Sequence, residues 1–171
     1  GGLAYYDTDT DLTWVADANL AQTSGYDAEG LMDWNQSMGW IASLNAQNAG
    51  LGYLGTNDWR LPTVTDTGTS GCDFGYTGTD CGYNVDLSTS EMAHMFYRTL
   101  GNVGGYDTSA NPTGCASLPS PYCLTNTGPF SNLQSGLYWS GTSYAPAPTS
   151  FAWHFDFRNG YQNRSEEHTS E

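Results

Sequence analysis

Three aspartates near the N-terminus, Asp7, Asp9 and Asp11, are the first residues whose type and spacing could do chemistry. Carboxylates are hard oxygen ligands that suit calcium, and the alternating spacing resembles the start of a calcium-binding loop. The EF-hand pattern is broken, however, because Leu12 stands where that loop requires glycine and Ala18 where it requires the bidentate glutamate. The sequence therefore favours a solvated acidic turn, keeps a calcium site as the alternative, and predicts no other cofactor.

Aromatic residues in the C-terminal third are the stronger indication of binding. Tyr138, Trp139 and Tyr144 flank a predicted strand and a loop that contains two prolines. Rings in such a place could stack on a sugar or anchor a protein partner. Core packing is an equal alternative for Trp139, whereas Tyr144 is expected to be exposed.

The segment 151–158 alternates between four aromatic residues and a second face that carries His154, Asp156 and Arg158. These three polar residues could meet a ligand or a metal, although the plainer interpretation is an exposed strand face. The following Asn159-Gly160 predicts a type I′ hairpin turn. Tyr161 should then begin a return strand that ends almost at once.

Catalytic motifs are absent from the sequence. There is no G-x-S-x-G nucleophile motif, and no glycine-rich phosphate loop follows a strand and opens a helix. Nothing singles out a pair of catalytic carboxylates. We therefore predict that the protein is not an enzyme.

The four cysteines form two neighbouring pairs, Cys72 with Cys81 and Cys115 with Cys123. Each pair closes a short loop, and neither has the C-x-x-C spacing of a zinc site. We predict two local disulfides in an oxidising compartment, with free cytosolic thiols as the alternative.

Composition limits the class of ligand. The 171 residues carry a formal net charge of -14, contain no lysine and have only four arginines. Nucleic acids and anionic glycans would be repelled, which leaves cations, neutral sugars or proteins as partners. The chain has no apolar run long enough to cross a membrane. It starts at Gly1 without a signal sequence, which we expect to have been removed or to lie outside the fragment.

Two helices and several short strands should position these residues. We expect strands at Gly2–Tyr6, Leu12–Val15, 57–63 and Leu137–Gly141. The first helix should span Trp34–Asn48, with an Asp33/Gln36 capping box and Gly50 at its end. Its predicted apolar stripe comprises Trp34, Met38, Ile41 and Leu44.

The second helix should follow a capping box at Ser88–Glu91 and stop at Gly101. Its predicted apolar stripe comprises Met92, Met95, Phe96 and Leu100. Residues 101–136 are rich in Gly, Pro, Ser and Asn, which predicts a long loop held by the second disulfide.

The segment Asn57-Asp58-Trp59-Arg60-Leu61-Pro62-Thr63, the signature segment below, combines an aromatic ring, a cation and a proline. Trp59 should face inward, and Pro62 should end the strand. Arg60 should pair with a carboxylate, so that Arg60→Ala would cost about 3–5 kcal/mol if the pair is buried and leave ligand preference unchanged.

The last eight residues, 164–171, change abruptly to charged composition and match one reading frame of a common sequencing adapter. We predict that they are foreign, that the domain occupies residues 1–163, and that the natural chain continues beyond Asn163.

Five parts of the sequence carry a family resemblance: the signature segment, Asp11-Leu12-Thr13-Trp14, the helix beginning near Trp34, Tyr138-Trp139-Ser140-Gly141-Thr142 and the Trp153–Gly160 hairpin. Together they resemble the Lcl C-terminal domain family. This family is named for a bacterial collagen-like adhesin, and the closest resemblance is to secreted members with a sorting and anchoring tail. It implies a C-type-lectin-like α+β fold, with two helices, a small twisted antiparallel sheet and long disulfide-held loops.

The resemblance also implies an extracellular or cell-surface module for adhesion that binds carbohydrate or protein. Related domains of the formylglycine-generating type suggest an enzyme as the alternative, and a purely structural surface protein is the third possibility. The calcium-lectin motifs E-P-N and Q-P-D are absent, and no basic patch exists for sulfated glycans. The oligomeric state does not follow from the sequence.

Overall fold

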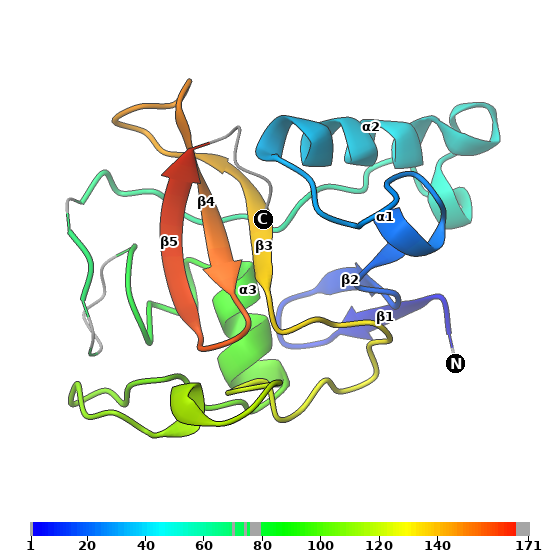
Figure 1. Cartoon of the computed structure of the whole chain (residues 1–171). Helices are drawn as coiled ribbons and strands as arrows, with labels where there is room; N and C mark the ends of the chain where they lie inside the picture. The colour runs from blue at the N-terminus through cyan, green and yellow to red at the C-terminus, as the bar shows by residue number, and fades with distance from the viewer. Residues whose placement is uncertain (1, 70, 74, 76–79, 167–171) are drawn as a thin grey trace.

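Two small antiparallel sheets and a few helices make up the fold (Figure 1). The computed structural model describes residues 2–69, 71–73, 75 and 80–166. Strands β1 (Ala4–Asp7) and β2 (Leu12–Val15) form a hairpin. Strands β3 (Leu137–Ser143), β4 (Phe151–Asp156) and β5 (Tyr161–Glu166) form the second sheet in that order. The predicted α+β class and both hairpins are therefore confirmed.

Helix α2 (Trp34–Gly50) begins where the sequence predicts, after the short helix α1 (Leu20–Thr23). The Asp33 carboxylate accepts from the Gln36 amide at 2.7 Å, and the Gln36 side chain accepts from the Asp33 amide at 2.8 Å. The predicted stripe is rotated, because Trp40 is buried and Met38 is 41% exposed. Helical geometry stops before Gln47, and a short 3-10 turn, Tyr53–Gly55, follows.

Helix α3 (Glu91–Ala93) continues as a π-helical turn, His94–Thr99. Its N-cap is Ser90, whose hydroxyl accepts from the Ala93 amide at 3.2 Å. The capping box predicted at Ser88–Glu91 is wrong, because the Glu91 carboxylate is bound by Arg60 and the Thr63 amide instead.

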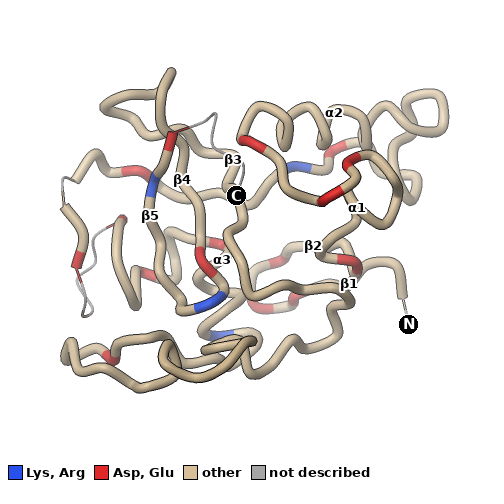
Figure 2. The backbone as a smooth tube through the Cα atoms, viewed as in Figure 1, with Lys and Arg blue, Asp and Glu red and all other residues tan. Residues whose placement is uncertain are grey.

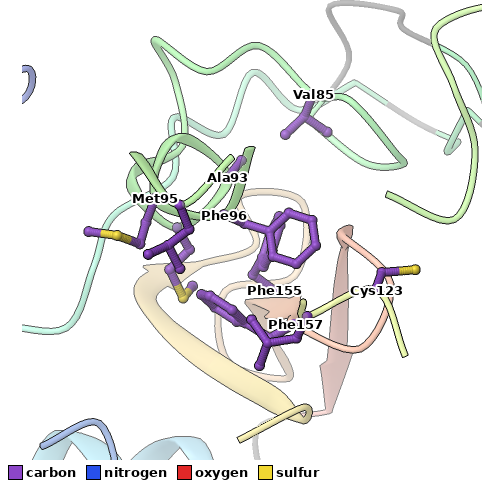
Figure 3. Packing of buried hydrophobic residues seen from close by; sticks show 10 residues of the cluster. Val85, Ala93, Met95, Phe96, Cys123, Phe155 and Phe157 are labelled. Atoms are coloured by element: carbon purple, nitrogen blue, oxygen red, sulfur yellow. The ribbon is translucent and has the colours of Figure 1, made fainter. Parts of the chain in front are cut away.

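The main core lies between this helix and one face of the second sheet. All four residues of the predicted stripe, Met92, Met95, Phe96 and Leu100, are buried. Figure 3 shows the ring of Phe96 beside those of Phe155 and Phe157, and the ring centroids are 5.5 and 5.7 Å away. These rings fix the sheet against the helix.

The signature segment is extended but is not a regular strand, which corrects the prediction. Pro62 uses its carbonyl to accept from the Gly141 amide of β3 at 2.8 Å. The Thr142 hydroxyl accepts from the Val64 amide and donates to the Val64 carbonyl, at 3.1 and 3.0 Å. Because proline has no N–H and a side chain replaces backbone partners here, no β-ladder forms.

The connection between β4 and β5 has four residues rather than the predicted two. Asp156 pairs with Tyr161 across the hairpin, and the Gly160 amide donates to the Asp156 carbonyl at 2.8 Å. Asn159 does not have the positive φ that a type I′ turn requires. The turn opens because Phe157 is buried in the core and donates its amide to Gly136.

Strand β5 is not cut off early, since Glu166 still pairs with Phe151 of β4. Arg164 packs its guanidinium 4.5 Å from the centre of the Tyr144 ring. Residues 167–171 lie outside the described part of the chain. The foreign origin of residues 164–171 remains a prediction.

Both predicted disulfides are present, Cys72–Cys81 and Cys115–Cys123. The second one anchors the 101–136 loop, where a 3-10 turn, Cys115–Ser117, is the only helical element. Buried Asn102 accepts from the Thr125 and Asn126 amides and closes the loop on itself. No helix among the described residues is long and apolar enough to cross a membrane.

Candidate functional site

A groove of about 1250 Å³ is a concave feature of the described residues that could hold a ligand. Its walls come from the β1–β2 hairpin, the 54–62 segment, α2 and the start of β3. Acidic positions recur along the backbone around β1, β2 and α1 (Figure 2). The groove therefore joins the N-terminal hairpin to the signature segment and the second sheet.

Half-buried aromatic rings line the groove. Trp59 is held rigidly, because its indole N–H donates to the Tyr53 carbonyl at 2.9 Å and its backbone exchanges two hydrogen bonds with the Asn45 side chain. Tyr138 packs edge-on against Phe157, with ring centroids 5.1 Å apart. Its hydroxyl accepts from the Gln134 amide at 2.9 Å. These rings are fixed in place before any ligand arrives.

Trp14 lines the same groove and carries a buried donor. The residue lines the groove from β2 and packs against the main core. Its indole Nε1 is buried and finds no acceptor among the residues described. A buried donor without a partner costs about 1–3 kcal/mol, so this N–H lowers the stability of the folded state.

Two arginines reach the groove, and each is already paired. Arg60 makes a two-pronged ion pair with Glu91, with both N···O distances 2.7 Å. The predicted carboxylate partner of Arg60 is thus confirmed and identified. Arg158 pairs with Asp156 through Nε at 2.9 Å and Nη2 at 2.8 Å. Neither arginine presents an unneutralised positive charge.

The pKa of Glu91 reflects this pairing. Burial opposes ionisation, but hydrogen bonds from Arg60 and the Thr63 amide outweigh it and hold the pKa below its usual value. Glu91 therefore stays charged and bound to Arg60 over the physiological range.

The predicted ligand-binding residues do not form one site. Tyr138, Trp139 and Arg158 line the groove, whereas Tyr144, His154 and Asp156 do not. Tyr138 and Trp139 lie on opposite faces of β3, and Trp139 is a core residue whose indole donates to Met32 at 2.9 Å. Tyr144 is half-buried, its ring edge-on to Trp153 with centroids 5.8 Å apart.

The prediction that His154 and Asp156 occupy an exposed strand face is wrong. Each is only 6% exposed, because β4 is the central strand and both of its faces are covered. Burial lowers the pKa of His154 to about 4; the charge of Asp156 opposes this shift, and that of Arg158 adds to it. His154 is therefore neutral at pH 7 and packs beside Trp139.

The three N-terminal aspartates bind separate partners. Asp7 accepts from the Thr99 hydroxyl at 2.8 Å, Asp9 lies 3.9 Å from Arg98, and Asp11 accepts from the Tyr6 hydroxyl. No group of three or more His, Cys, Asp or Glu side chains in the described ranges is arranged to hold a metal ion. Calcium binding by these aspartates stays a prediction.

Sequence analysis missed several residues of the groove. Glu91 appears in the sequence only as part of a capping box, and its pairing with Arg60 spans 31 positions. Glu29 and Asp58 lie in loops, where no periodic pattern marks a functional face. The one available signal was that Asp58 belongs to the signature segment.

Comparison with known proteins fits this arrangement of motifs. The family model described as the Lcl C-terminal domain matches residues 4–171. No curated protein and no solved structure matches the chain. The motifs that indicated this family, from Trp14 through the signature segment to Trp139 and the β4–β5 hairpin, all lie within the matched residues. The chain belongs to the Lcl C-terminal domain family.

Proposed function

We propose that this domain is an extracellular or cell-surface binding module that recognises carbohydrate in the groove. The observation that carries the proposal is the combination of fixed, half-buried rings with hydrogen-bonding groups in one groove of about 1250 Å³. Aromatic rings stack on the C–H faces of sugars, while amides and carboxylates accept from their hydroxyls. Small-molecule pockets measure about 300–1,000 Å³, so this groove suits several sugar units.

Other features support the extracellular role. Two disulfides persist in oxidising compartments, and they fit the secreted or surface location that the resemblance to this family implies. All four cysteines are bonded, which favours a binding role over a thiol-based enzyme of the formylglycine-generating type. The small sheets and long disulfide-held loops are compatible with the C-type-lectin-like fold that we propose for the domain.

A protein ligand is the second candidate. Leu31 and Leu54 line the groove and are 54% and 42% exposed. Exposed apolar side chains beside a concave surface are a common feature of protein interfaces.

The test is titration calorimetry with neutral oligosaccharides chosen from a glycan array. Trp59→Leu should weaken binding about 5- to 30-fold, corresponding to about 1–2 kcal/mol of lost stacking. Tyr144→Leu makes a similar ring-to-leucine change outside the groove and should leave the affinity unchanged. Melting curves establish that each variant is folded at the titration temperature.

The opposite pattern, a loss with Tyr144→Leu alone, would place the site at the β3–β4 loop and reject the groove. Binding of no glycan on the array would reject the carbohydrate proposal. Repeating the titration with calcium and with a chelator tests the metal prediction for the acidic turn.

A further inference from the structure

The cations of the groove cannot serve an anionic ligand. The guanidinium of Arg60 already faces both oxygens of Glu91, and that of Arg158 faces Asp156. A sulfate or carboxylate on a ligand would have to displace these internal partners. Recognition of a sulfated sugar would thus begin with the loss of an existing ion pair.

Two carboxylates of the groove differ from these arginines, because no described residue pairs with them. Glu29 and Asp58 line the groove with exposed side chains, and neither carboxylate has a hydrogen-bond or ion-pair partner in the described part of the chain. Their backbones are ordered: the Glu29 amide donates to Asp27 at 3.0 Å, and the residue after Asp58 is fixed by Asn45. The two charges are therefore held at the groove without being neutralised.

The other charged residues that line the groove increase its excess of negative charge. Asp11 and Asp17 also line the groove, so five carboxylates including Glu91 stand against two arginines. Asp17 accepts from Asn19, Thr23 and Asn132 and keeps its charge. The whole chain adds a formal charge of -14 with no lysine. A groove of this kind concentrates positively charged ligands.

We infer that the groove prefers carbohydrates that carry protonated amines, as in de-N-acetylated amino sugars, over neutral and sulfated ones. This inference rests on the carbohydrate-binding function proposed above and names its ligand class. The rings supply stacking common to all sugars, while Glu29 and Asp58 select for the ammonium group. Two exposed charge pairs correspond to about 2- to 30-fold in affinity at low salt.

Two hexasaccharides that differ only in the amine provide the test. Hexa-N-acetylglucosamine is neutral, and hexaglucosamine has the same backbone with free amines. Affinities are measured by calorimetry at about pH 5.5, where the amines are protonated and ordinary carboxylates are ionised. A sulfated hexasaccharide of the same length is the third probe.

The double variant Glu29→Gln/Asp58→Asn removes both unpaired charges and keeps the side-chain shapes. The double variant Asp9→Asn/Asp107→Asn removes two exposed charges that do not line the groove and is the matched control. We expect the wild type and the control to bind hexaglucosamine about 2- to 30-fold tighter than the neutral sugar at low salt. The Gln/Asn variant should lose most of this preference.

Equal or weaker binding of hexaglucosamine by the wild type would overturn the inference while the proposed function stands. A preference that survives undiminished in the Gln/Asn variant would overturn the assignment to Glu29 and Asp58. Tightest binding of the sulfated probe would contradict the charge argument, and binding of no sugar at all would reject the proposed function itself.

Discussion

Removing the Arg60–Glu91 ion pair is the most informative perturbation of the fold. Arg60 belongs to the signature segment, and Glu91 is the first residue of α3. Both terminal guanidinium nitrogens, Nη1 and Nη2, lie 2.7 Å from carboxylate oxygens of Glu91, which also accepts from the Thr63 amide at 2.7 Å. One carboxylate thus fixes the extended segment to the helix that carries the main core.

The expected loss of stability depends on how exposed the two side chains are. The Arg60 side chain is 49% exposed and that of Glu91 is 21% exposed, so the 3–5 kcal/mol of a buried pair does not apply. Charge-assisted hydrogen bonds contribute about 1.5–3 kcal/mol and exposed ion pairs about 0–1 kcal/mol. We expect Arg60→Ala to cost about 1–2 kcal/mol, or about 2–8 °C in Tm. Glu91→Ala should cost about 2–3 kcal/mol, since the Thr63 amide also loses its acceptor.

A double-mutant cycle measured by urea unfolding checks this reasoning. The coupling energy between Arg60→Ala and Glu91→Ala should be about 1–2 kcal/mol. Arg60→Lys should recover only part of it, because an ammonium cannot make the two-pronged contact. Arg98→Ala, which removes a 69% exposed arginine, is the control and should change stability by less than about 0.5 kcal/mol. Additive losses, with a coupling below about 0.3 kcal/mol, would refute the role of the pair.

Three further results are expected. The pKa of His154 is about 4 in the folded state and about 6.5 in the unfolded state, so the unfolded chain binds the proton first as the pH falls. The free energy of unfolding should therefore fall by up to about 3 kcal/mol between about pH 7 and pH 4. This loss should be missing in His154→Gln. Trp14→Phe should lower the free energy of unfolding by about 1–3 kcal/mol less than Trp139→Phe does, because only the second change removes a hydrogen bond. Equal losses in thermal unfolding would contradict this. Replacing Cys72 and Cys81 together by serine should cost about 2–3 kcal/mol in urea unfolding, and an unchanged midpoint would show that the cross-link is dispensable.

Local features of the fold could be predicted from the sequence. The Asp33/Gln36 capping box, the Met92–Leu100 stripe and both short-range disulfides involve residues close together in the chain. Their geometry depends little on distant segments, so spacing alone identifies them. The strands of both hairpins could be found for the same reason.

The sequence-based predictions fail where contacts between residues far apart in the chain decide the structure. Glu91 leaves the predicted capping box because Arg60, 31 positions away, binds its carboxylate. The alternation of β4 identifies its two faces correctly but cannot reveal that the His154 face is also covered. Burial of a central strand depends on what packs across the sheet, which period-two patterning does not encode.

The candidate site is least accessible to sequence reasoning. Trp59 and Tyr138 are recognisable as aromatic, but their shared groove follows from contacts between the signature segment and β3. Arg60 lines the groove, so the proposed function and the expectation that Arg60→Ala leaves ligand preference unchanged lead to different results. Its substitution would leave Glu91 without its partner and make the groove more negative.

Hydrogen-exchange mass spectrometry with and without a bound oligosaccharide tests the central claim, that the groove is the binding surface, most directly. The probe is whichever of hexaglucosamine and hexa-N-acetylglucosamine binds the wild type more tightly. We predict slower exchange in the segments 11–19, 54–62 and 130–139, which line the groove, and unchanged exchange in the loop 144–150. Protection confined to the loop 144–150, with no change in the groove segments, would contradict the account.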